Sequence, residues 1–255
     1  MVDTHCHLSR CEDSPETVIE RATEAGLTRL LTVGLDEQSN REQIALAEAF
    51  DPVFAAVGRH PNGADGFDEA AADDIRELAG HARVRAIGET GLDFYRDTAE
   101  PENQRRAFTA QIEIAVDTGL PLVIHLRDRQ NSDQAAAETF RMLDDAGDDL
   151  TVILHCFSAP NRVAEAVERG WYCSFAGNVT YPANEDLRVA AAKVPDAQIL
   201  VETDSPYLTP QSKRRERNHP ANVVETAALV ADLRGSSPGD FDRLVTENST
   251  RLFGW

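Results

Sequence analysis

Lysine is almost absent from this chain, and its scarcity coincides with a large excess of acidic residues. Only Lys193 and Lys213 are lysines among 25 basic residues, which face 44 acidic residues and leave a formal net charge of −19. A chain with this charge repels polyanions at long range. At about 1 M salt, however, the Debye length is only about 3 Å, so short-range metal coordination would decide binding. The composition therefore favours adaptation to a salty cytoplasm and does not exclude a nucleic-acid substrate.

Long apolar runs, targeting segments and paired cysteines are also missing. The sequence contains no run of about 18 apolar residues, so it predicts no membrane-spanning helix. The N-terminus also lacks the apolar segment of a signal peptide. The four cysteines show no CxxC spacing, which is typical of free thiols in a reducing compartment. These absences predict a soluble cytoplasmic protein that does not bind a membrane, and no feature indicates an obligate protein partner.

Apolar strand-like runs alternate with longer amphipathic segments along the chain. The predicted strands are Val2-Asp3, Arg29-Val33, Val53-Val57, Val84-Glu89, Leu122-His125, Val152-His155, Trp171-Phe175 and Ile199-Glu202. The predicted helices include Ser14-Ala25, Gln38-Phe50, Asp68-Leu78, Glu102-Thr118, Asp133-Ala146 and Pro160-Arg169. This alternation indicates parallel β/α units. Because 255 residues without a repeat or linker suit a one-domain barrel, we predict a single α/β domain over residues 1–255, a (β/α)8 TIM-type barrel. A doubly wound open sheet is the main alternative.

Histidines and acids recur where the predicted strands end. The six residues of this kind are His5, His7, Glu89, His125, His155 and Asp204. Side chains alternate in an extended segment, so His5 and His7 share one face and Cys6 points away. Barrel chemistry belongs at the C-terminal ends of the strands, where we expect the six residues to form one metal site. Four imidazoles and two carboxylates suit zinc, manganese, cobalt or iron, whereas magnesium prefers oxygen ligands.

Seven segments, taken in order, carry a family resemblance. They are VDTHCHLS at 2–9, VGRHP at 57–61, AIGETGLDFYR at 86–96, LPLVIHLRDR at 120–129, LHCFS at 154–158, LVETDSPYLTP at 200–210 and RNHPANV at 217–223. With them the chain resembles the TatD-family metal-dependent deoxyribonucleases, a branch of the amidohydrolase-like barrels. The resemblance implies two divalent metal ions bridged by Glu89. It places His5, His7 and Asp204 on one ion, and His125 and His155 on the other.

Three positions depart from the family pattern, and none of them removes a predicted ligand. Ser9 stands where relatives usually carry an acid, and Ala159 replaces a usual glycine. Only Met1 and Val2 precede the aspartate of the first strand, so that strand is expected to be minimal or truncated. Cys6 and Cys156 adjoin predicted ligands, but we expect them to be packing thiols rather than ligands or nucleophiles.

The ligand set predicts hydrolysis. Two metal ions about 3.5–4 Å apart can hold a hydroxide and stabilise the attacking and leaving oxygens of a phosphodiester. Asp204 is the predicted base that takes a proton from the attacking water, and Glu89 is the second predicted catalytic residue. Asp93 and Glu202 are expected to orient ligand imidazoles. We therefore predict a nuclease that cleaves DNA, and a 3′–5′ exonuclease is one version of this prediction. The predicted cofactors are zinc, manganese, cobalt or magnesium ions.

Two other functions stay open at this point. An ester or amide hydrolase, such as a D-aminoacyl-tRNA deacylase, would share the same metal chemistry. A non-catalytic nucleic-acid-binding protein with a structural metal is an alternative of a different class. Structural zinc sites usually saturate one ion with four cysteine or histidine ligands, whereas the predicted set covers six positions, which disfavours this alternative.

Several side chains near the expected site are candidates for binding substrate. His60 follows the third strand and could contact a phosphate or a leaving group. Tyr95 could bind the face of a base, and Arg127 could hold a phosphate with its planar fork unless it pairs with Asp128. The one basic cluster, on the loop after Asp204, could follow the phosphates of a strand or be an ordinary solvated loop. The residues of this cluster that could contact substrate are Arg214, Arg215 and Arg217, together with the neighbouring amide side chain of Asn218.

Overall fold

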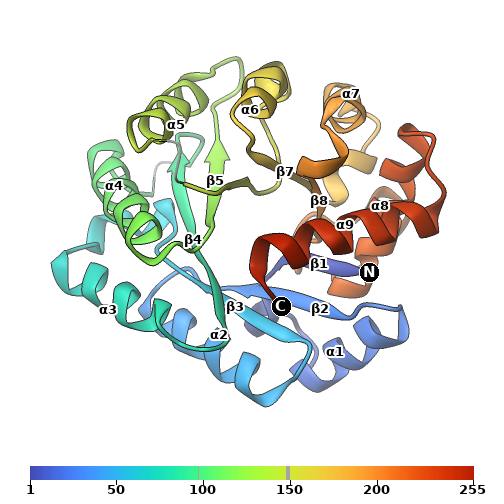
Figure 1. The fold of residues 1–255 in the computed structure, drawn as a ribbon, viewed down its shortest axis with the longest axis horizontal. Helices are drawn as coiled ribbons and strands as arrows, with labels where there is room; N and C mark the ends of the chain where they lie inside the picture. Colours follow the sequence, from blue (N-terminus) through green and yellow to red (C-terminus); the bar gives the residue numbers. More distant parts are fainter. Residues whose placement is uncertain (97, 148–149) are drawn as a thin grey trace.

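In the described part of the chain, eight parallel strands follow one another around the sheet in sequence order (Figure 1). The structure is a computed structural model that describes residues 1–96, 98–147 and 150–255. The strands are β1 (Val2–Cys6), β2 (Arg29–Val33), β3 (Val53–Val57), β4 (Val84–Asp93), β5 (Leu122–Arg127), β6 (Val152–Leu154), β7 (Tyr172–Phe175) and β8 (Ile199–Val201). Each strand pairs in parallel with the next along the chain.

The sheet closes between β8 and β1 through a short set of backbone contacts at the C-terminal ends of these strands. Cys6 and Ser205 form a single parallel bridge. The amide of His7 donates to the carbonyl of Ser205 at 2.8 Å, and the amide of Asp204 donates to the carbonyl of His5 at 2.9 Å. The sheet is therefore a nearly closed (β/α)8 barrel, as predicted, and the open doubly wound alternative is wrong.

The helices form a ring around the strands (Figure 1). They are α1 (Pro15–Glu24), α2 (Glu37–Ala49), α3 (Glu69–Ala79), α4 (Pro101–Thr118), α5 (Gln134–Asp145), α6 (Val163–Glu168), α7 (Glu185–Lys193), α8 (Val223–Leu233) and α9 (Pro238–Phe253). Helix α1 begins where the sequence predicts, because Ser14 accepts a hydrogen bond from the amide of Thr17 and Pro15 occupies the first helical position. Within the described ranges, no helix has both the length and the apolar character that crossing a membrane requires.

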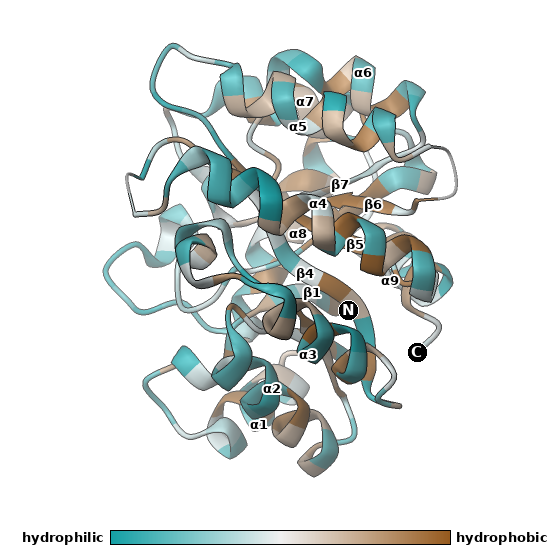
Figure 2. Cartoon of the chain, turned by 90° about the vertical axis from the view of Figure 1, so that its left-hand side faces the viewer, coloured by the Kyte–Doolittle hydropathy of each residue, from teal (hydrophilic) through white to brown (hydrophobic). Residues whose placement is uncertain are grey.

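The hydrophobic core has two layers. A large outer layer lies between the strands and the helices, so the strands and the inward helix faces are apolar while the outer helix faces are polar (Figure 2). A smaller cluster fills the inside of the barrel and comprises Leu31, Val33, Phe54, Ala56, Ala86, Val123, Ile153, Leu200 and Phe253. Trp255 stacks on Phe253 and Phe54, with ring centres 4.6 and 5.4 Å apart. Phe253 and Trp255 thus close the interior of the barrel beside the start of β3.

Three strands are longer than predicted. Strand β1 has five residues and includes His5, so the expectation of a minimal first strand is wrong. Glu89 lies within β4 rather than at its end, because β4 continues to Asp93 and pairs there with Arg127 of the extended β5. The predicted helix from Pro160 begins instead with a turn of 3-10 helix, and α6 follows it.

Two glycines allow β4 to carry Glu89 at its centre. The pairing register between β4 and β5 shifts between Ile87 and Thr90. Gly88 and Gly91 flank this irregularity with φ of +137° and +136°, which side chains rarely tolerate. A Cβ atom on Gly91 would lie 2.1 Å from the carbonyl oxygen of His125. The Gly-Glu-Thr-Gly sequence therefore permits close approach of two strands that both contribute to the site.

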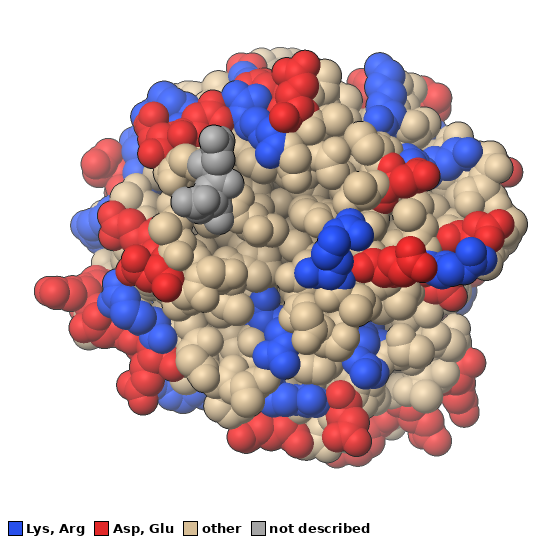
Figure 3. Space-filling view, in the orientation of Figure 1, with Lys and Arg blue, Asp and Glu red and all other residues tan. Residues whose placement is uncertain are grey.

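Ion pairs on the surface show one advantage of arginine over lysine in this chain. Acidic and basic side chains are interleaved around the edge of the face shown in Figure 3. Arg105 contacts both carboxylate oxygens of Glu138 at 2.6 and 3.0 Å, and Arg169 contacts both oxygens of Asp144 at 2.6 and 2.8 Å. Only the planar guanidinium offers this two-pronged geometry. Adaptation to salt stays a prediction from composition.

Candidate metal centre

Four of the predicted ligands converge in a first donor group at the C-terminal mouth of the barrel. Nε2 of His5 and Nε2 of His7 are 3.3 Å apart. Oε2 of Glu89 lies 3.4 Å from the first nitrogen and 3.6 Å from the second. Oδ1 of Asp204 lies 3.5 Å from Nε2 of His7 and 3.9 Å from Nε2 of His5. Two nitrogens and two carboxylate oxygens therefore surround one small space.

The other oxygen of Glu89 belongs to a second donor group. Its Oε1 atom lies 2.6 Å from Nδ1 of His125 and 3.2 Å from Nε2 of His155. Nε2 of His60 also lies within this group, 3.5 Å from Oε1 and 3.3 Å from Nδ1 of His125. His60 was predicted only as a substrate contact. Its position after β3, at the end of a strand like the other ligands, was the signal that sequence reasoning did not use.

The donor distances fit cation binding. Ligand atoms of a tetrahedral zinc ion lie about 2.0–2.1 Å from the metal, and therefore about 3.3–3.5 Å from one another. The first group, centred on His5 and His7, has separations of 3.3–3.9 Å. The 2.6 Å contact between Glu89 and His125 is a hydrogen bond, which a shared cation would lengthen. The residues present thus suit two cations, with one carboxylate oxygen of Glu89 available to each.

Buried partners orient three of these imidazoles. Nδ1 of His155 lies 2.7 Å from Oε1 of Glu202, and Nε2 of His125 lies 3.2 Å from Oδ2 of Asp93. Nδ1 of His7 lies 2.9 Å from a carbonyl oxygen of β2. In each ring the contact occupies one nitrogen and leaves the other directed at Glu89. Asp93 and Glu202 therefore lie where a carboxylate can fix the tautomer and angle of a ligand imidazole.

The surroundings of the donor groups lower the pKa of the carboxyl groups of Glu89 and Asp204. They raise the pKa of His7, His125 and His155 and lower that of His5. Burial would raise the pKa of Glu89, but His155, His60 and His125 hold it well below its usual value. Burial would lower the pKa of His155, but Glu202 and Glu89 raise it well above the ordinary range. His60 differs, because burial and His125 lower its pKa to about 3. Without cations, protons on some imidazoles balance the carboxylates, so cations and protons compete for the same nitrogens.

Two buried side chains hold the segment that carries Asp204. The carboxylate of Asp3 accepts hydrogen bonds from the amide of Thr203 at 2.9 Å and from its hydroxyl at 2.5 Å. The amide of Asn218 donates to the carbonyl oxygens of Thr203 at 2.9 Å and Tyr207 at 2.5 Å. These contacts support the left-handed backbone of Asp204, whose φ is +53°.

Asn218 therefore does not have the substrate contact predicted for it. Its side chain is only 2% exposed, and both of its donor hydrogens serve the loop. Its carbonyl oxygen accepts from the amide of His219 and from the side chain of Asn222. The role of Asp3 was missed, although an acid inside an apolar strand is itself a signal of a buried polar network.

Arg127 and Tyr95 lie together beside the second donor group. The guanidinium carbon of Arg127 is 4.1 Å from the ring centre of Tyr95. Within the described residues, the side chain of Arg127 forms no hydrogen bond or ion pair, and the alternative bridge to Asp128 is absent. Asp128 instead accepts hydrogen bonds from the amides of Ala135 and Ala136 at the start of α5. The fork of Arg127 therefore has free donors.

The basic cluster is only partly available. Arg217 donates to a carboxylate oxygen of Glu12 at 2.9 Å on the loop after β1. Arg214 lies over the ring of Tyr181, with its guanidinium carbon 4.3 Å from the ring centre. No ion pair or hydrogen bond involves the side chain of Arg215 in the described part of the chain. Arg214 and Arg215 are therefore better placed than Arg217 to meet an anion.

The cysteines next to ligands are packed rather than reactive. Cys6 is fully buried, and its thiol lies 3.4 Å from the carbonyl oxygen of Leu31, away from the donor groups. Cys156 lies 3.5 Å from the side-chain amide of Asn178. Burial raises the pKa of both thiols well above the usual value. Both are therefore neutral at physiological pH, which disfavours nucleophilic catalysis.

Ser9 has a structural use in place of the usual acid. Its hydroxyl accepts a hydrogen bond of 2.7 Å from the side chain of Gln43. The carbonyl oxygen of Gln43 accepts from the hydroxyl of Thr32, which in turn accepts from the amide of Leu8. This chain of hydrogen bonds fixes the segment that follows His7.

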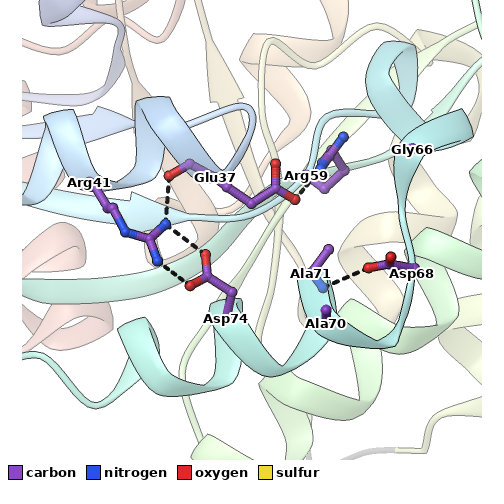
Figure 4. Close-up of a pocket in the computed structure, with 8 residues that line it drawn as sticks. All are labelled: Glu37, Arg41, Arg59, Gly66, Asp68, Ala70, Ala71 and Asp74. Carbon is purple, nitrogen blue, oxygen red and sulfur yellow. Dashed lines mark hydrogen bonds and ion pairs between the residues drawn. The ribbon is translucent and has the colours of Figure 1, made fainter.

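A hollow of about 400 Å³ lies away from the donor groups, between α2, α3 and the 3-10 helix after β3 (Figure 4). Its lining residues are Glu37, Arg41, Arg59, Gly66, Asp68, Ala70, Ala71 and Asp74. Arg41 pairs with Asp74 and Arg59 pairs with Glu37. Both arginines of the hollow are thus paired with acids, while Asp68 accepts a hydrogen bond from the amide of Ala71 at the start of α3. Because Arg59 adjoins His60, these pairs anchor the loop that carries the histidine.

Together, a (β/α)8 barrel and histidine–carboxylate groups at its mouth define a metal-dependent hydrolase. The chain belongs to the family of TatD-related DNases, because the family model "TatD related DNase" matches residues 2–254. It is 39% identical to a protein of Mycobacterium tuberculosis described as an uncharacterized metal-dependent hydrolase TatD, over 100% of this chain and 98% of the relative. It is 32% identical to the 3′-5′ ssDNA/RNA exonuclease TatD of Cronobacter sakazakii, over 96% and 94%.

The fold has a close counterpart among solved structures. The TatD homologue YjjV of Escherichia coli superimposes with a TM-score of 0.89 at 26% identity, over 100% of this chain and 98% of that chain. The predicted family, barrel and hydrolase class are thereby confirmed.

Proposed function

We propose that this chain is a nuclease that hydrolyses phosphodiester bonds of single-stranded DNA with the help of two divalent cations. The observation that carries the proposal is the division of Glu89, whose Oε2 faces one donor group and whose Oε1 faces the other. Relatives described as 3′-5′ ssDNA/RNA exonucleases support the substrate class and an exonuclease. A single structural ion would not need two donor groups joined by one carboxylate.

Each donor group would hold one cation. His5, His7 and Asp204 would hold the first, and His125 and His155 the second, with Glu89 between them and His60 next to the second. The nitrogen-rich set favours zinc, manganese or cobalt over magnesium. When bound, two such ions lower the pKa of water and neutralise negative charge on the phosphodiester.

The side chains around the cations would handle the proton and the substrate. Burial would raise the pKa of Asp204, but the neighbouring His7 and His155 keep it below its usual value, so its carboxylate is ionised at neutral pH. It can therefore accept a proton from the attacking water. Arg127 offers free guanidinium donors to a phosphate oxygen, and Tyr95 offers the face of an aromatic ring beside it.

The experiment that tests this function begins with protein stripped of metal. Zinc, manganese, cobalt or magnesium is then returned, and hydrolysis of single-stranded DNA, duplex DNA, RNA and a D-aminoacyl-tRNA is measured. We expect metal-dependent shortening of single-stranded DNA, with nucleotides released from the 3′ end. Cleavage of the aminoacyl ester alone would replace the nuclease by a deacylase. Tight nucleic-acid binding with no hydrolysis, at full metal occupancy, would favour a non-catalytic binding protein.

A further inference from the structure

Two tyrosines at the barrel mouth expose unusual amounts of apolar surface. Among the described residues, the large hydrophobic side chains that are exposed are Tyr95, Val116, Val189 and Tyr207. The two valines lie on α4 and α7. Tyr207 is 46% exposed and lies on the loop after β8, three residues beyond Asp204. It lies within the segment LVETDSPYLTP at 200–210, for which only Asp204 and Glu202 were predicted to have roles.

The backbone of Tyr207 is fixed although its ring is exposed. Its amide donates to the carbonyl of Asp204 at 2.8 Å, and its carbonyl accepts from the side chain of Asn218 at 2.5 Å. The ring meets the imidazole of His7 edge to face, with ring centres 6.1 Å apart. Its hydroxyl has no hydrogen-bond partner in the described ranges, whereas the hydroxyl of Tyr181 donates to the carbonyl of Thr209 at 3.0 Å. Tyr207 thus presents a pre-positioned aromatic face that nothing described covers.

We propose that Tyr207 is a nucleobase-binding residue, which stacks on the base of a nucleotide whose phosphodiester lies at the first donor group. This inference rests on the proposed nuclease function. A base is separated from its own phosphate by one sugar, so a phosphodiester beside His7 and Asp204 brings a base within reach of the neighbouring ring. Every base has an aromatic face, so stacking on tyrosine binds a strand without requiring a sequence.

A second aromatic ring lies on the other side of the mouth. Tyr95 follows β4 and stacks against Arg127 of β5, whereas Tyr207 follows β8 and lies next to His7, just beyond β1. In a ring of strands ordered β1 to β8, β4 and β5 lie across the barrel from β8 and β1. Bases inside a duplex already stack on their neighbours, so two exposed rings on opposite sides of the barrel mouth favour an unpaired strand.

The test compares Tyr207→Ala with Tyr207→Phe, which keeps the ring and removes only the hydroxyl. Val189→Ala is the matched control, because it removes another exposed apolar side chain from an outer helix. Each protein is assayed with two single-stranded oligonucleotides that differ only in whether the 3′-terminal nucleotide carries a base or is abasic. Cleavage by metal-loaded protein gives kcat and KM, and fluorescence anisotropy with a chelator present gives binding without cleavage.

We expect Tyr207→Ala to weaken binding and raise KM for the intact oligonucleotide by about ten- to a hundredfold, with a much smaller change for the abasic one. Tyr207→Phe and Val189→Ala should stay within about twofold of the original protein, because the ring rather than the hydroxyl stacks. Loss of the same size on both oligonucleotides would overturn the proposal and make Tyr207 a residue that supports the loop.

Failure of the nuclease function gives a different pattern. The original protein would then cleave neither oligonucleotide at full metal occupancy. The anisotropy measurement still tests whether Tyr207 stacks on a base. A base-dependent loss of affinity in Tyr207→Ala supports stacking even in a protein that does not cleave. Equal affinity of the original protein for intact and abasic strands rejects stacking whether or not cleavage occurs.

Discussion

The two ends of the barrel solve opposite packing problems. At the start of β3 the interior is closed by Phe54, Phe253 and Trp255, with the tilted ring of Trp255 in contact with both phenyl rings. At the other end the interior holds imidazoles and carboxylates, of which His5 is fully buried and Glu89 is 3% exposed. Apolar rings need only contact, whereas buried polar groups need partners. The closed end should therefore govern stability, and the polar end should govern metal binding and chemistry.

The largest effect should come from Asp204→Asn at the polar end. An amide of similar size cannot accept the proton of the attacking water, so we expect kcat to fall by about 10²–10⁴-fold with little change in KM. Metal content is measured beside the kinetics, because loss of a cation would also lower kcat. Near-normal kcat at full metal content would show that Asp204 is not the base.

Glu89→Gln should empty both donor groups together. Each carboxylate oxygen of Glu89 serves a different group, so neutralising it weakens both. Metal per chain, measured by elemental analysis after gel filtration, should fall well below that of the original protein. His60→Asn is the comparison, because it removes a donor from the second group only. A Glu89→Gln protein that retains two tightly bound ions would disprove the bridge.

Phe253→Ala tests the closed end. Phe253 is 4% exposed inside the barrel, so its loss leaves a cavity and should lower the free energy of unfolding by about 3–5 kcal/mol. Urea unfolding measures this change, and metal content below the unfolding transition should stay normal. If metal binding were lost while the protein stayed folded, the two ends would be coupled and the comparison would not hold.

The affinity for metal should depend on pH in a defined direction. His7, His125 and His155 have pKa values raised above the usual histidine value, because nearby carboxylates outweigh the effect of burial. These imidazoles must lose their protons before they bind a cation, so affinity should rise with pH until they are neutral and fall in acid. Calorimetry in buffers of different ionisation enthalpy should detect proton release. His60, with a pKa of about 3, is already neutral and should release none.

The smallest effect should come from the basic cluster. Replacing Arg214 and Arg215 by alanine should weaken metal-free binding of single-stranded DNA a few-fold. It should also flatten the slope of log affinity against log salt by about 1.4, if both contact phosphates. Arg217→Ala is the matched control, because Arg217 is paired with Glu12. An unchanged slope in the double variant would make the cluster an ordinary solvated loop. In the same salt series, thermal stability that falls with salt would contradict adaptation of the acidic chain to salt.

Periodicity and position along the chain were enough to predict the barrel and the convergence of the six predicted donor residues. Parallel strands in a closed sheet end at the same face, so residues as distant as His5 and Asp204 must meet if each ends a strand. The same reasoning applied to His60 would have placed it in the second group. Strand lengths were less predictable, because β4 extends past Glu89 only by pairing with β5, and pairing is not visible in one segment alone.

The sequence by itself thus determined the class of fold, the family and most residues of the two donor groups, because these follow from local alternation, from ordered motifs and from residue chemistry. Tertiary structure decided which polar groups have partners. Asp3 meets Thr203 across 200 residues of chain, and that contact helps to position Asp204. The burial of Asn218 and the exposure of the Tyr207 ring both depend on how one loop packs against another. Local patterns report which face a side chain occupies, whereas only the folded chain determines what lies opposite that face.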